Sequence, residues 1–539
     1  MRNVLIKILL PISVIFAGGL KSPAEFLGYD LGDHFTYHHR VVSYYEHVAD
    51  AASNVKIIPY GKTYEQRPLL VAVISSDENM AMLDDLRMDN LKRAGLMKGN
   101  PTGKKVGIVW LSYNVHGNEA NSTEAAMKTL HALADRNNKS TQEWLENTIV
   151  ILDPCINPDG RDRYTNWFRM TGNRWPDADP LGREHMEPWP GGRTNHYYFD
   201  LNRDWAWQTQ IESESRITLY NQWLPHVHVD FHEQGINNPY YFAPAAEPFH
   251  EYITDWQREL QTMIGKNHAK YFDKNNWLYF TKEVFDLLYP SYGDTYPTYN
   301  GAIGMTYEQA GHSRGGLAVE TEDGDTLTLK DRLTHHHTTG LSTVEVASQN
   351  VDRMVSEFTK FFANGKKNPR GEFNHYIIPK SNRIDKVNDL KEWLDKNGIE
   401  HRVASVGKSV KGFSYQSGKK EQVRLKKGDM VVSAKQPKSV LVQVLFEPQT
   451  TLQDTLSYDL TAWALPYVYG LDAYAIKGDV KSSTARHFTS KSKVISGSPY
   501  AYILPWKGIH DLKFLAYLFK NDIVTRVSDE PFELGGKKV

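Results

Sequence analysis

Short, nearly unbroken apolar runs alternate with helical stretches along roughly the first 360 residues of the chain. The runs at 105–113, 147–153 and 225–231 have the length and continuity of strands that are covered on both faces. Residues 123–135 and 208–223 carry apolar side chains at helical spacing instead. This alternation predicts an α/β fold with a mixed, mainly parallel, twisted sheet and helices on both faces.

Other segments indicate where domains begin and end. We expect a helix over 36–55 and a long loop rich in Gly, Pro and Trp over 157–199. A helix should end near Phe362, and the composition of 364–371 is typical of a linker. The predicted organisation is therefore a larger domain over 25–364, followed by a smaller α/β domain over 372–539.

The predicted second domain contains a weak internal repeat. Tyr376-Ile-Ile-Pro precedes a helical stretch and Ile399-Glu-His-Arg-Val403, whereas Tyr502-Ile-Leu-Pro precedes a similar stretch and Ile523-Val-Thr-Arg-Val527. The second copy reaches Gly535-Gly-Lys-Lys-Val539 where its next strand should start, so we expect the chain to be truncated relative to a longer parent. Chance similarity between two common strand–helix–strand units is the alternative.

The first residues have the pattern of an export signal. A basic start is followed by the uncharged run Ile8–Leu20, which is shorter than the roughly 20 apolar residues that a membrane span needs. We therefore predict a signal peptide over 1–20, export to the periplasm or the extracellular space, and no membrane span after signal removal. An uncleaved anchor is the alternative.

Composition excludes several classes of partner. Hydrophobic residues make up 40% and charged residues 24%, which is ordinary for a globular protein. With 63 basic and 64 acidic residues and no basic stripe, nucleic acid is not an expected partner. A single cysteine, Cys155, rules out an intrachain disulfide, and its apolar neighbours predict a buried packing role.

A candidate metal site follows two of the predicted strands. His116 and Glu119 are three residues apart just beyond the strand at 105–113, and His232 closes the strand at 225–231. Ligands in such sheets gather beyond the carboxyl ends of the strands, so these side chains can meet. Two His and one Glu, with one position left for water, are a frequent ligand set of catalytic zinc.

The order of motifs resembles the zinc carboxypeptidases of the carboxypeptidase A type over roughly residues 40–360. It is carried by five segments in the family order: Tyr60-Gly-Lys-Thr-Tyr-Glu-Gln-Arg-Pro-Leu69, His116-Gly-Asn-Glu119, Asn157-Pro-Asp-Gly160, Asp200-Leu-Asn-Arg-Asp-Trp205 and His232. The resemblance implies a carboxypeptidase-like fold and one zinc ion held by His116, Glu119 and His232. It further implies that Asn202 and Arg203 bind the substrate's C-terminal carboxylate and that Asp200 orients the first histidine.

The resemblance also implies a general base and a tyrosine that closes over the substrate. Glu308, in Thr306-Tyr-Glu308, matches the family's base better than Glu320, which also lies on a strand-like run. Tyr289 aligns best with the tyrosine, and Tyr292 is the alternative.

The sequence departs from the family pattern at two places. Asn118 stands where the family often has an arginine, so one cation on the substrate side is absent. The arginine that stabilises the oxyanion is expected after Asn157-Pro-Asp-Gly160. Arg169 fits this place approximately, with Arg163 and Arg174 as alternatives.

The implied activity is that of a zinc metallocarboxypeptidase, which hydrolyses C-terminal peptide bonds by a zinc-activated water with Glu308 as general base. Its substrate would be a peptide or a peptidoglycan stem with a free C-terminal carboxylate. One alternative is a zinc-dependent deacylase that acts on small N-acyl amino acids, and another is a relative that binds without catalysis. The Asn202–Arg203 pair favours the carboxypeptidase.

Overall fold

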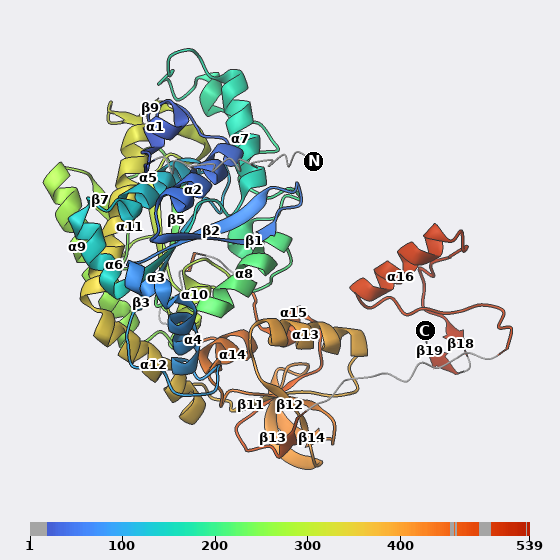
Figure 1. The fold of residues 1–539 in the computed structure, drawn as a ribbon. Helices are drawn as coiled ribbons and strands as arrows, with labels where there is room; N and C mark the ends of the chain where they lie inside the picture. The colour runs from blue at the N-terminus through green and yellow to red at the C-terminus, as the bar shows by residue number, and fades with distance from the viewer. Residues whose placement is uncertain (1–18, 453–456, 459–460, 485–496, 535, 539) are drawn as a thin grey trace, which may run out of the picture. The chain divides into compact units, whose positions relative to one another are not determined.

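The computed structural model describes residues 19–452, 457–458, 461–484, 497–534 and 536–538 (Figure 1). The chain divides into two compact units. The larger contains Met1–Arg370 together with Lys435–Leu445 and Gln449–Trp463. The smaller contains Gly371–Ala434, Phe446–Pro448 and Ala464–Val539. The larger unit thus includes two segments that follow the predicted boundary near residue 372.

The larger unit is built on an eight-stranded sheet in the order β1-β2-β4-β3-β5-β8-β6-β7. Its central strands β4, β3, β5 and β8 are parallel. β1 and β2 join the sheet in antiparallel fashion, and β6 pairs antiparallel with β8 and parallel with β7. The mixed, mainly parallel sheet confirms the predicted fold class. The strands are β1 Val55–Lys62, β2 Pro68–Ile74, β3 Gly107–Tyr113, β4 Thr148–Asp153, β5 Val227–Gln234, β6 Tyr240–Tyr241, β7 Tyr279–Phe280 and β8 Ile303–Ala310.

Helices cover both faces of this sheet because alternate side chains of each buried strand point in opposite directions (Figure 1). On β3, Val109 and Leu111 pack into the cluster that contains Leu130 of α5 and Leu333 of α11. Trp110 points to the other face, where its ring lies 5.7 Å from that of Tyr220 on α8. A strand that is buried on both faces needs a continuous apolar run, which is the pattern that the sequence shows here.

The helices of the larger unit lie before, between and after its strands along the chain. They are α1 Pro23–Leu27, α2 His38–Ala51, α3 Asp77–Ala81, α4 Leu83–Arg93, α5 Asn121–Ala134, α6 Lys139–Asn147, α7 Pro158–Thr171, α8 Ile211–Trp223, α9 Asp255–Asn275, α10 Thr295–Tyr299, α11 Leu329–Gln349, α12 Val351–Lys367 and α14 Ser439–Phe446. Short 3-10 turns lie at Arg183–His185, Leu201–Arg203 and His312–Arg314, and a small hairpin pairs β9 Ala318–Glu320 with β10 Thr326–Thr328.

Two predicted loops begin too early along the chain. The predicted loop over 157–199 begins with helix α7, because Asn157 caps it by accepting the Gly160 N–H (3.0 Å) and Pro158 occupies its first position. Proline and glycine usually indicate a turn, but Pro158 and Gly160 both lie in the first turn of the helix. The predicted linker at 364–371 also starts too early, since α12 continues to Lys367.

The smaller unit has its own sheet, in which seven strands pair antiparallel in the order β14-β13-β16-β11-β15-β12-β17. Its elements are β11 His375–Ile378, α13 Ile384–Lys396, β12 His401–Ala404, β13 Lys408–Ser414, β14 Lys419–Leu425, β15 Met430–Ser433, α15 Leu465–Val468, β16 Tyr474–Ile476, β17 Ser482–Ser483, α16 Ile509–Lys520, β18 Glu533–Leu534 and β19 Lys537–Lys538. In the second copy of the predicted repeat, α16 forms, but 502–505 and 523–527 are not strands.

Two further predictions concern the ends of the fold and its cysteine. Most of the predicted signal peptide lies outside the described residues, which begin at Gly19. None of the helices in the described residues has the length and apolar character that crossing a membrane requires. Cys155 is buried, as its apolar neighbours predict.

Candidate metal and substrate site

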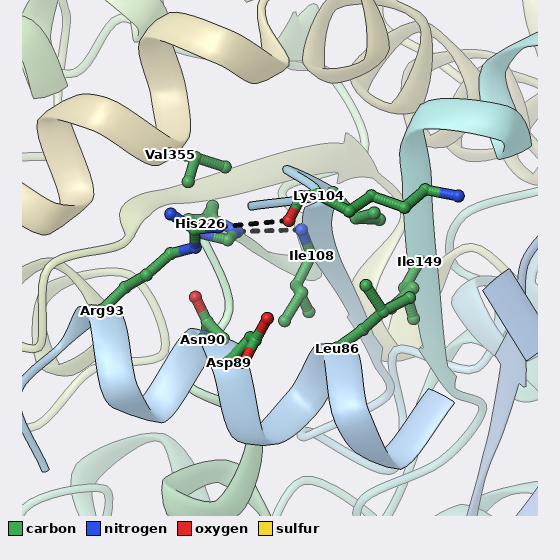
Figure 2. Close-up of a pocket in the computed structure, with 10 residues that line it drawn as sticks. Leu86, Asp89, Asn90, Arg93, Lys104, Ile108, Ile149, His226 and Val355 are labelled. Carbon is green, nitrogen blue, oxygen red and sulfur yellow. Dashed lines mark hydrogen bonds between the residues drawn. The ribbon is translucent and has the colours of Figure 1, made fainter. Parts of the chain in front are cut away.

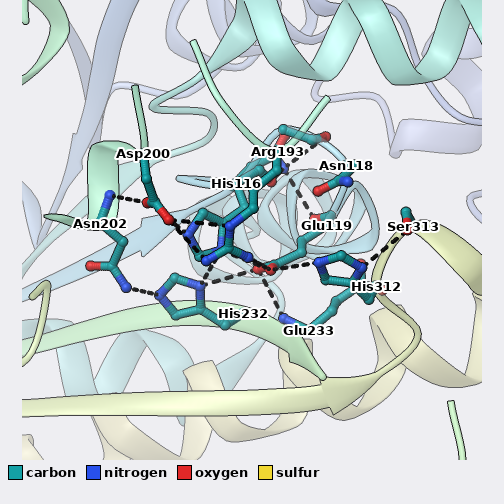
Figure 3. A network of polar contacts seen from close by, with 12 residues as sticks. His116, Asn118, Glu119, Arg193, Asp200, Asn202, His232, Glu233, His312 and Ser313 are labelled. Carbon is teal, nitrogen blue, oxygen red and sulfur yellow. Dashed lines mark hydrogen bonds and ion pairs between the residues drawn. The ribbon is translucent and has the colours of Figure 1, made fainter. Parts of the chain in front are cut away.

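His116, Glu119 and His232 converge on one point at the carboxyl edge of the central sheet (Figure 3). His116 Nδ1 lies 2.7 Å from Glu119 Oε1, and His232 Nδ1 lies 3.1 Å from Glu119 Oε2. The two Nδ1 atoms are 3.2 Å apart, and all three side chains are buried. Among the described residues this is the one group of His, Cys, Asp or Glu side chains arranged to hold a metal ion.

The backbone between β3 and α5 is folded to present the first two of these side chains. Asn114 has a positive φ of 58°, and its side-chain amide donates to the carbonyl groups of His116 (2.7 Å) and Glu119 (3.1 Å). The third side chain comes from β5, two strand positions before its end. Glu119 Oε2 accepts the backbone N–H of Glu233 (3.0 Å), which ties the loop to that strand.

The second ring nitrogen of each histidine faces a carboxylate. His116 Nε2 lies 3.1 Å from Asp200 Oδ1, and His232 Nε2 lies 3.0 Å from Asp230 Oδ2. Burial disfavours charge on Asp200, but His116 and the nearby guanidinium groups hold its pKa well below the usual value. Although burial alone would lower the pKa of His232, Asp230 and Glu119 hold it well above the ordinary value. The cluster thus stabilises positive charge at its centre.

This donor set fits a zinc ion. Two imidazole nitrogens and a carboxylate face one another at 2.7–3.2 Å, so one divalent cation can satisfy all three donors at once. Carboxylates on the distal nitrogens fix the tautomer and orientation of ligating histidines. Asp200 stands where that role was expected, whereas Asp230 was not among the predicted residues.

Asn202 and Arg203 lie beside the cluster, on the turn Leu201–Arg203. Asn202 Nδ2 is 3.2 Å from His232 Nε2, and its Oδ1 accepts the backbone N–H of Gly293 (2.9 Å). The Arg203 guanidinium lies over the ring of Tyr292, 4.6 Å from its centroid. Both residues line a cleft of about 240 Å³, in which a guanidinium can bind a carboxylate through two parallel hydrogen bonds.

The cleft has sixteen lining residues in the described part of the chain. They are His116, Glu119, Arg193, Asn202, Arg203, His232, Glu233, Gln234, Phe285, Asp286, Tyr292, Asp294, Thr306, Glu308, His312 and Tyr458. Of the residues predicted from sequence, the three candidate ligands, Asn202, Arg203 and Glu308 are in this set. Arg169 and Tyr289 are not.

Glu308 lies on β8 directly beside His232 on β5, in parallel register. Burial, together with the negative charge of Glu119, raises the pKa of Glu308 to about 8. A carboxylate with a raised pKa in a cleft is suited to accept and return a proton near neutral pH. Glu320, the alternative base, is exposed on β9 and does not line the cleft.

The structure does not bring Arg169 to the cleft. Its guanidinium donates to the Phe35 carbonyl (2.8 Å) and stacks 3.9 Å from the ring centroid of Tyr37. Of the two alternatives, Arg163 donates to backbone carbonyls such as that of Gly191 (2.9 Å), and Arg174 does not line the cleft either.

Arg193 is the arginine that faces the ligands. Its Nε and Nη2 donate to Asp200 Oδ2 (3.1 and 3.0 Å), and its Nη1 lies 3.5 Å from Glu119 Oε1. Sequence reasoning missed it because the residue lies in an irregular segment. The available signal was the Asn157-Pro-Asp-Gly160 motif, which binds this segment directly.

Close backbone packing holds Arg193 in place. Asn157 Nδ2 and the Gly117 N–H both donate to the Arg193 carbonyl, at 3.1 and 3.3 Å. A Cβ at Gly160 would lie 2.3 Å from the Gly192 carbonyl oxygen, which is too close for two non-bonded atoms. Glycine at position 160 therefore permits the approach that brings Arg193 to the ligands.

Tyr289 and Tyr292 occupy different environments. The Tyr289 hydroxyl accepts from Trp207 Nε1 (2.9 Å) outside the cleft, whereas the Tyr292 ring lies beneath the Arg203 guanidinium inside it. The alternative weighed from sequence, Tyr292, is thus the one that faces the cleft. Asn118 does not face it and donates to Glu187 Oε2 (2.7 Å).

A second hollow, beside α4, has a different character (Figure 2). It has a volume of about 10 Å³, which is room for no more than a water molecule. Its one histidine, His226, accepts the Ile108 N–H through Nδ1 (2.9 Å), and burial lowers its pKa to about 3. This hollow is part of the packing between α4 and the sheet.

The comparison with known protein families matches the part of the chain that carries the candidate metal ligands. The family model described as zinc carboxypeptidase matches residues 41–259, which include every candidate ligand and the Asn202–Arg203 pair. None of the curated proteins matches the chain.

Among solved structures, the chain is similar to a metallo-carboxypeptidase from Burkholderia cenocepacia, with 14% identity over 58% of this chain and 69% of that one and a TM-score of 0.40. It is also similar to a metallo-carboxypeptidase from Pseudomonas aeruginosa (12% identity, 59% and 68% coverage, TM-score 0.39). A third is the carboxypeptidase A from Helicoverpa armigera (14%, 61% and 75%, 0.38). Residues 41–259 of the chain thus match the zinc carboxypeptidase family, and this match covers the candidate ligands.

Proposed function

We propose that this chain is a zinc-dependent metallocarboxypeptidase that removes the last residue of peptides with a free C-terminal carboxylate. The observation that carries this proposal is the presence of three candidate ligands, a buried glutamate and an Asn–Arg pair in one cleft. A bound zinc ion would supply a Lewis acid and would activate water at neutral pH.

The chain's own side chains divide the remaining work. Arg203 and Asn202 bind the terminal carboxylate, which restricts cleavage to the end of a peptide. Glu308 accepts the proton of the attacking water and returns it to the amine that leaves. Arg193 donates to the oxygen on which negative charge develops. Asp200 and Asp230 hold the two histidines in orientation.

The proposal is tested with a pair of blocked dipeptides that differ only at the C-terminus, one with a free carboxylate and one amidated. We expect hydrolysis of the first and none of the second, because only the first can engage Arg203. Equal cleavage of both would contradict exopeptidase action. Preference for an N-acyl amino acid over the dipeptide would favour a deacylase, and a peptidoglycan stem peptide tests that substrate in the same assay.

Glu308→Gln provides the matching test on the enzyme. The amide keeps the size of the side chain but cannot accept the proton, so kcat should fall by roughly 10²- to 10⁴-fold with zinc content unchanged. Glu320→Gln is the control, since this residue is exposed on β9, and it should retain full activity. The reverse result would transfer the role of base to Glu320.

We also propose that the protein is exported, on the basis of its basic start and the short uncharged run Ile8–Leu20. Expression with its own N-terminus should yield a processed chain outside the cytoplasm. Accumulation of the full-length chain in the cytoplasm would contradict this.

A further inference from the structure

One lining residue of the cleft comes from far outside the family match. Tyr458 belongs to Gln449–Trp463, one of the two late segments that form part of the larger unit. It is 51% exposed, so about half of its surface is not used in packing the fold. A large, half-exposed aromatic side chain in a cleft is available for contact with a ligand.

The position of Tyr458 is fixed by specific contacts. Its backbone N–H donates to Asp286 Oδ2 (2.8 Å), and Asp286 itself lines the cleft. The ring centroid lies 5.9 Å from that of Phe285 and 6.3 Å from that of Tyr292, which it meets edge to face. Three aromatic rings therefore form one wall of the cleft, which we call the aromatic wall: Phe285, Tyr292 and Tyr458.

Contacts on both sides of Tyr458 hold the late segments in place, one to the rest of the larger unit and one between the two segments. Lys438 is 2% exposed and donates to Asn300 Oδ1 (2.6 Å) and Asn221 Oδ1 (3.2 Å). After Tyr458, Trp463 donates through Nε1 to the Val444 carbonyl (3.0 Å). A buried polar group that loses its hydrogen-bond partner costs free energy, so these contacts fix the positions of the two segments.

A chain of contacts connects Tyr458 with the carboxylate-binding group. The Arg203 guanidinium lies on the face of Tyr292, and Tyr292 meets Tyr458 edge to face. A terminal carboxylate bound by Arg203 would therefore bring the side chain of the same substrate residue toward the aromatic wall.

We propose that Tyr458 contacts the side chain of the substrate's C-terminal residue and favours large, aromatic side chains there. This inference rests on the proposed carboxypeptidase function and names its substrate class. It also means that the catalytic cleft is completed by a segment beyond the domain that the family model covers.

A purely structural role for Tyr458 makes a different prediction. If its ring only supported Tyr292 and Arg203, its removal would weaken the binding of every substrate equally, because each has a terminal carboxylate. Contact with the substrate side chain instead makes the loss depend on that side chain. The experiment therefore compares substrates rather than variants alone.

The test uses the full chain with zinc and two blocked dipeptides, one ending in phenylalanine and one in alanine. For Tyr458→Ala, we expect KM for the phenylalanine substrate to rise roughly three- to tenfold, the size of an aromatic contact. KM for the alanine substrate should change less than twofold, with kcat unchanged for both. Tyr458→Phe should behave as the wild type, since the contact is made by the ring.

Tyr517→Ala is the matched control, because Tyr517 is 59% exposed on α16 of the smaller unit, and it should leave both KM values unchanged. Equal increases in KM for both dipeptides, or no increase, would overturn the inference. Failure of the wild-type protein to cleave either dipeptide would instead overturn the proposed function. Equal melting temperatures of the wild type and Tyr458→Ala verify that the variant is folded.

Discussion

Replacement of Arg193 by methionine tests the proposal that this residue stabilises the negative charge that develops on the substrate oxygen. Two of its nitrogens, Nε and Nη2, are held by Asp200 Oδ2 at 3.1 and 3.0 Å, which leaves Nη1 facing the ligands, 3.5 Å from Glu119 Oε1. The variant thus removes one donor that is fixed in advance and aimed at developing negative charge. Such a loss costs about 3 kcal/mol, or roughly 10²- to 10³-fold in kcat, with little change in KM.

The assay measures kcat and KM on a blocked dipeptide, together with zinc content, because loss of Arg193 also removes a partner of Asp200. Arg203→Met should show the opposite pattern, a raised KM, since its guanidinium binds the substrate carboxylate in the ground state. Arg169→Met should leave kcat unchanged, because that side chain stacks on Tyr37. A raised KM with unchanged kcat in Arg193→Met would refute the assigned role, as would a large loss of kcat in Arg169→Met.

Two other predictions concern metal affinity and stability. Asp200→Asn removes the negative charge beside His116 Nε2, so zinc affinity should fall roughly 10- to 100-fold in a competition titration with a chelator, and unchanged affinity would contradict the orienting role. Burial lowers the pKa of Lys438 to about 7. An unfolded lysine titrates near pKa 10.4, so below pH 7 Lys438 is protonated in both the folded and the unfolded state. The cost of burying its charge therefore destabilises the folded state fully below pH 7, and this destabilisation is lost as the pH rises. The stability of the wild type relative to Lys438→Met should therefore increase by about 2 kcal/mol between pH 7 and pH 9 in chemical denaturation, whereas a flat difference would show that Lys438 titrates normally.

The metal ligands could be predicted because they lie directly after strands that are recognisable in the sequence. Buried parallel strands have continuous apolar runs, and polar side chains at their carboxyl ends must lie at the same edge of the sheet. His116, Glu119 and His232 satisfy both conditions. Glu308 came from a family motif, and its strand β8 pairs directly with the strand that carries His232.

The remainder of the site depends on contacts that leave no periodic signal. Arg193 is placed by backbone hydrogen bonds from Asn157 and Gly117, and Tyr458 by a backbone N–H that reaches Asp286. Helix α7 is not evident from the sequence because capping by Asn157 overrides the turn preference of Pro158 and Gly160.

Zinc stoichiometry tests the central claim most directly. Purified wild-type chain, dialysed against metal-free buffer, should retain close to one zinc ion per molecule by elemental analysis. His232→Ala should lose most of it while keeping the melting temperature of metal-depleted wild type. A wild-type chain that binds no zinc, or a His232→Ala chain that keeps a full equivalent, would contradict the account.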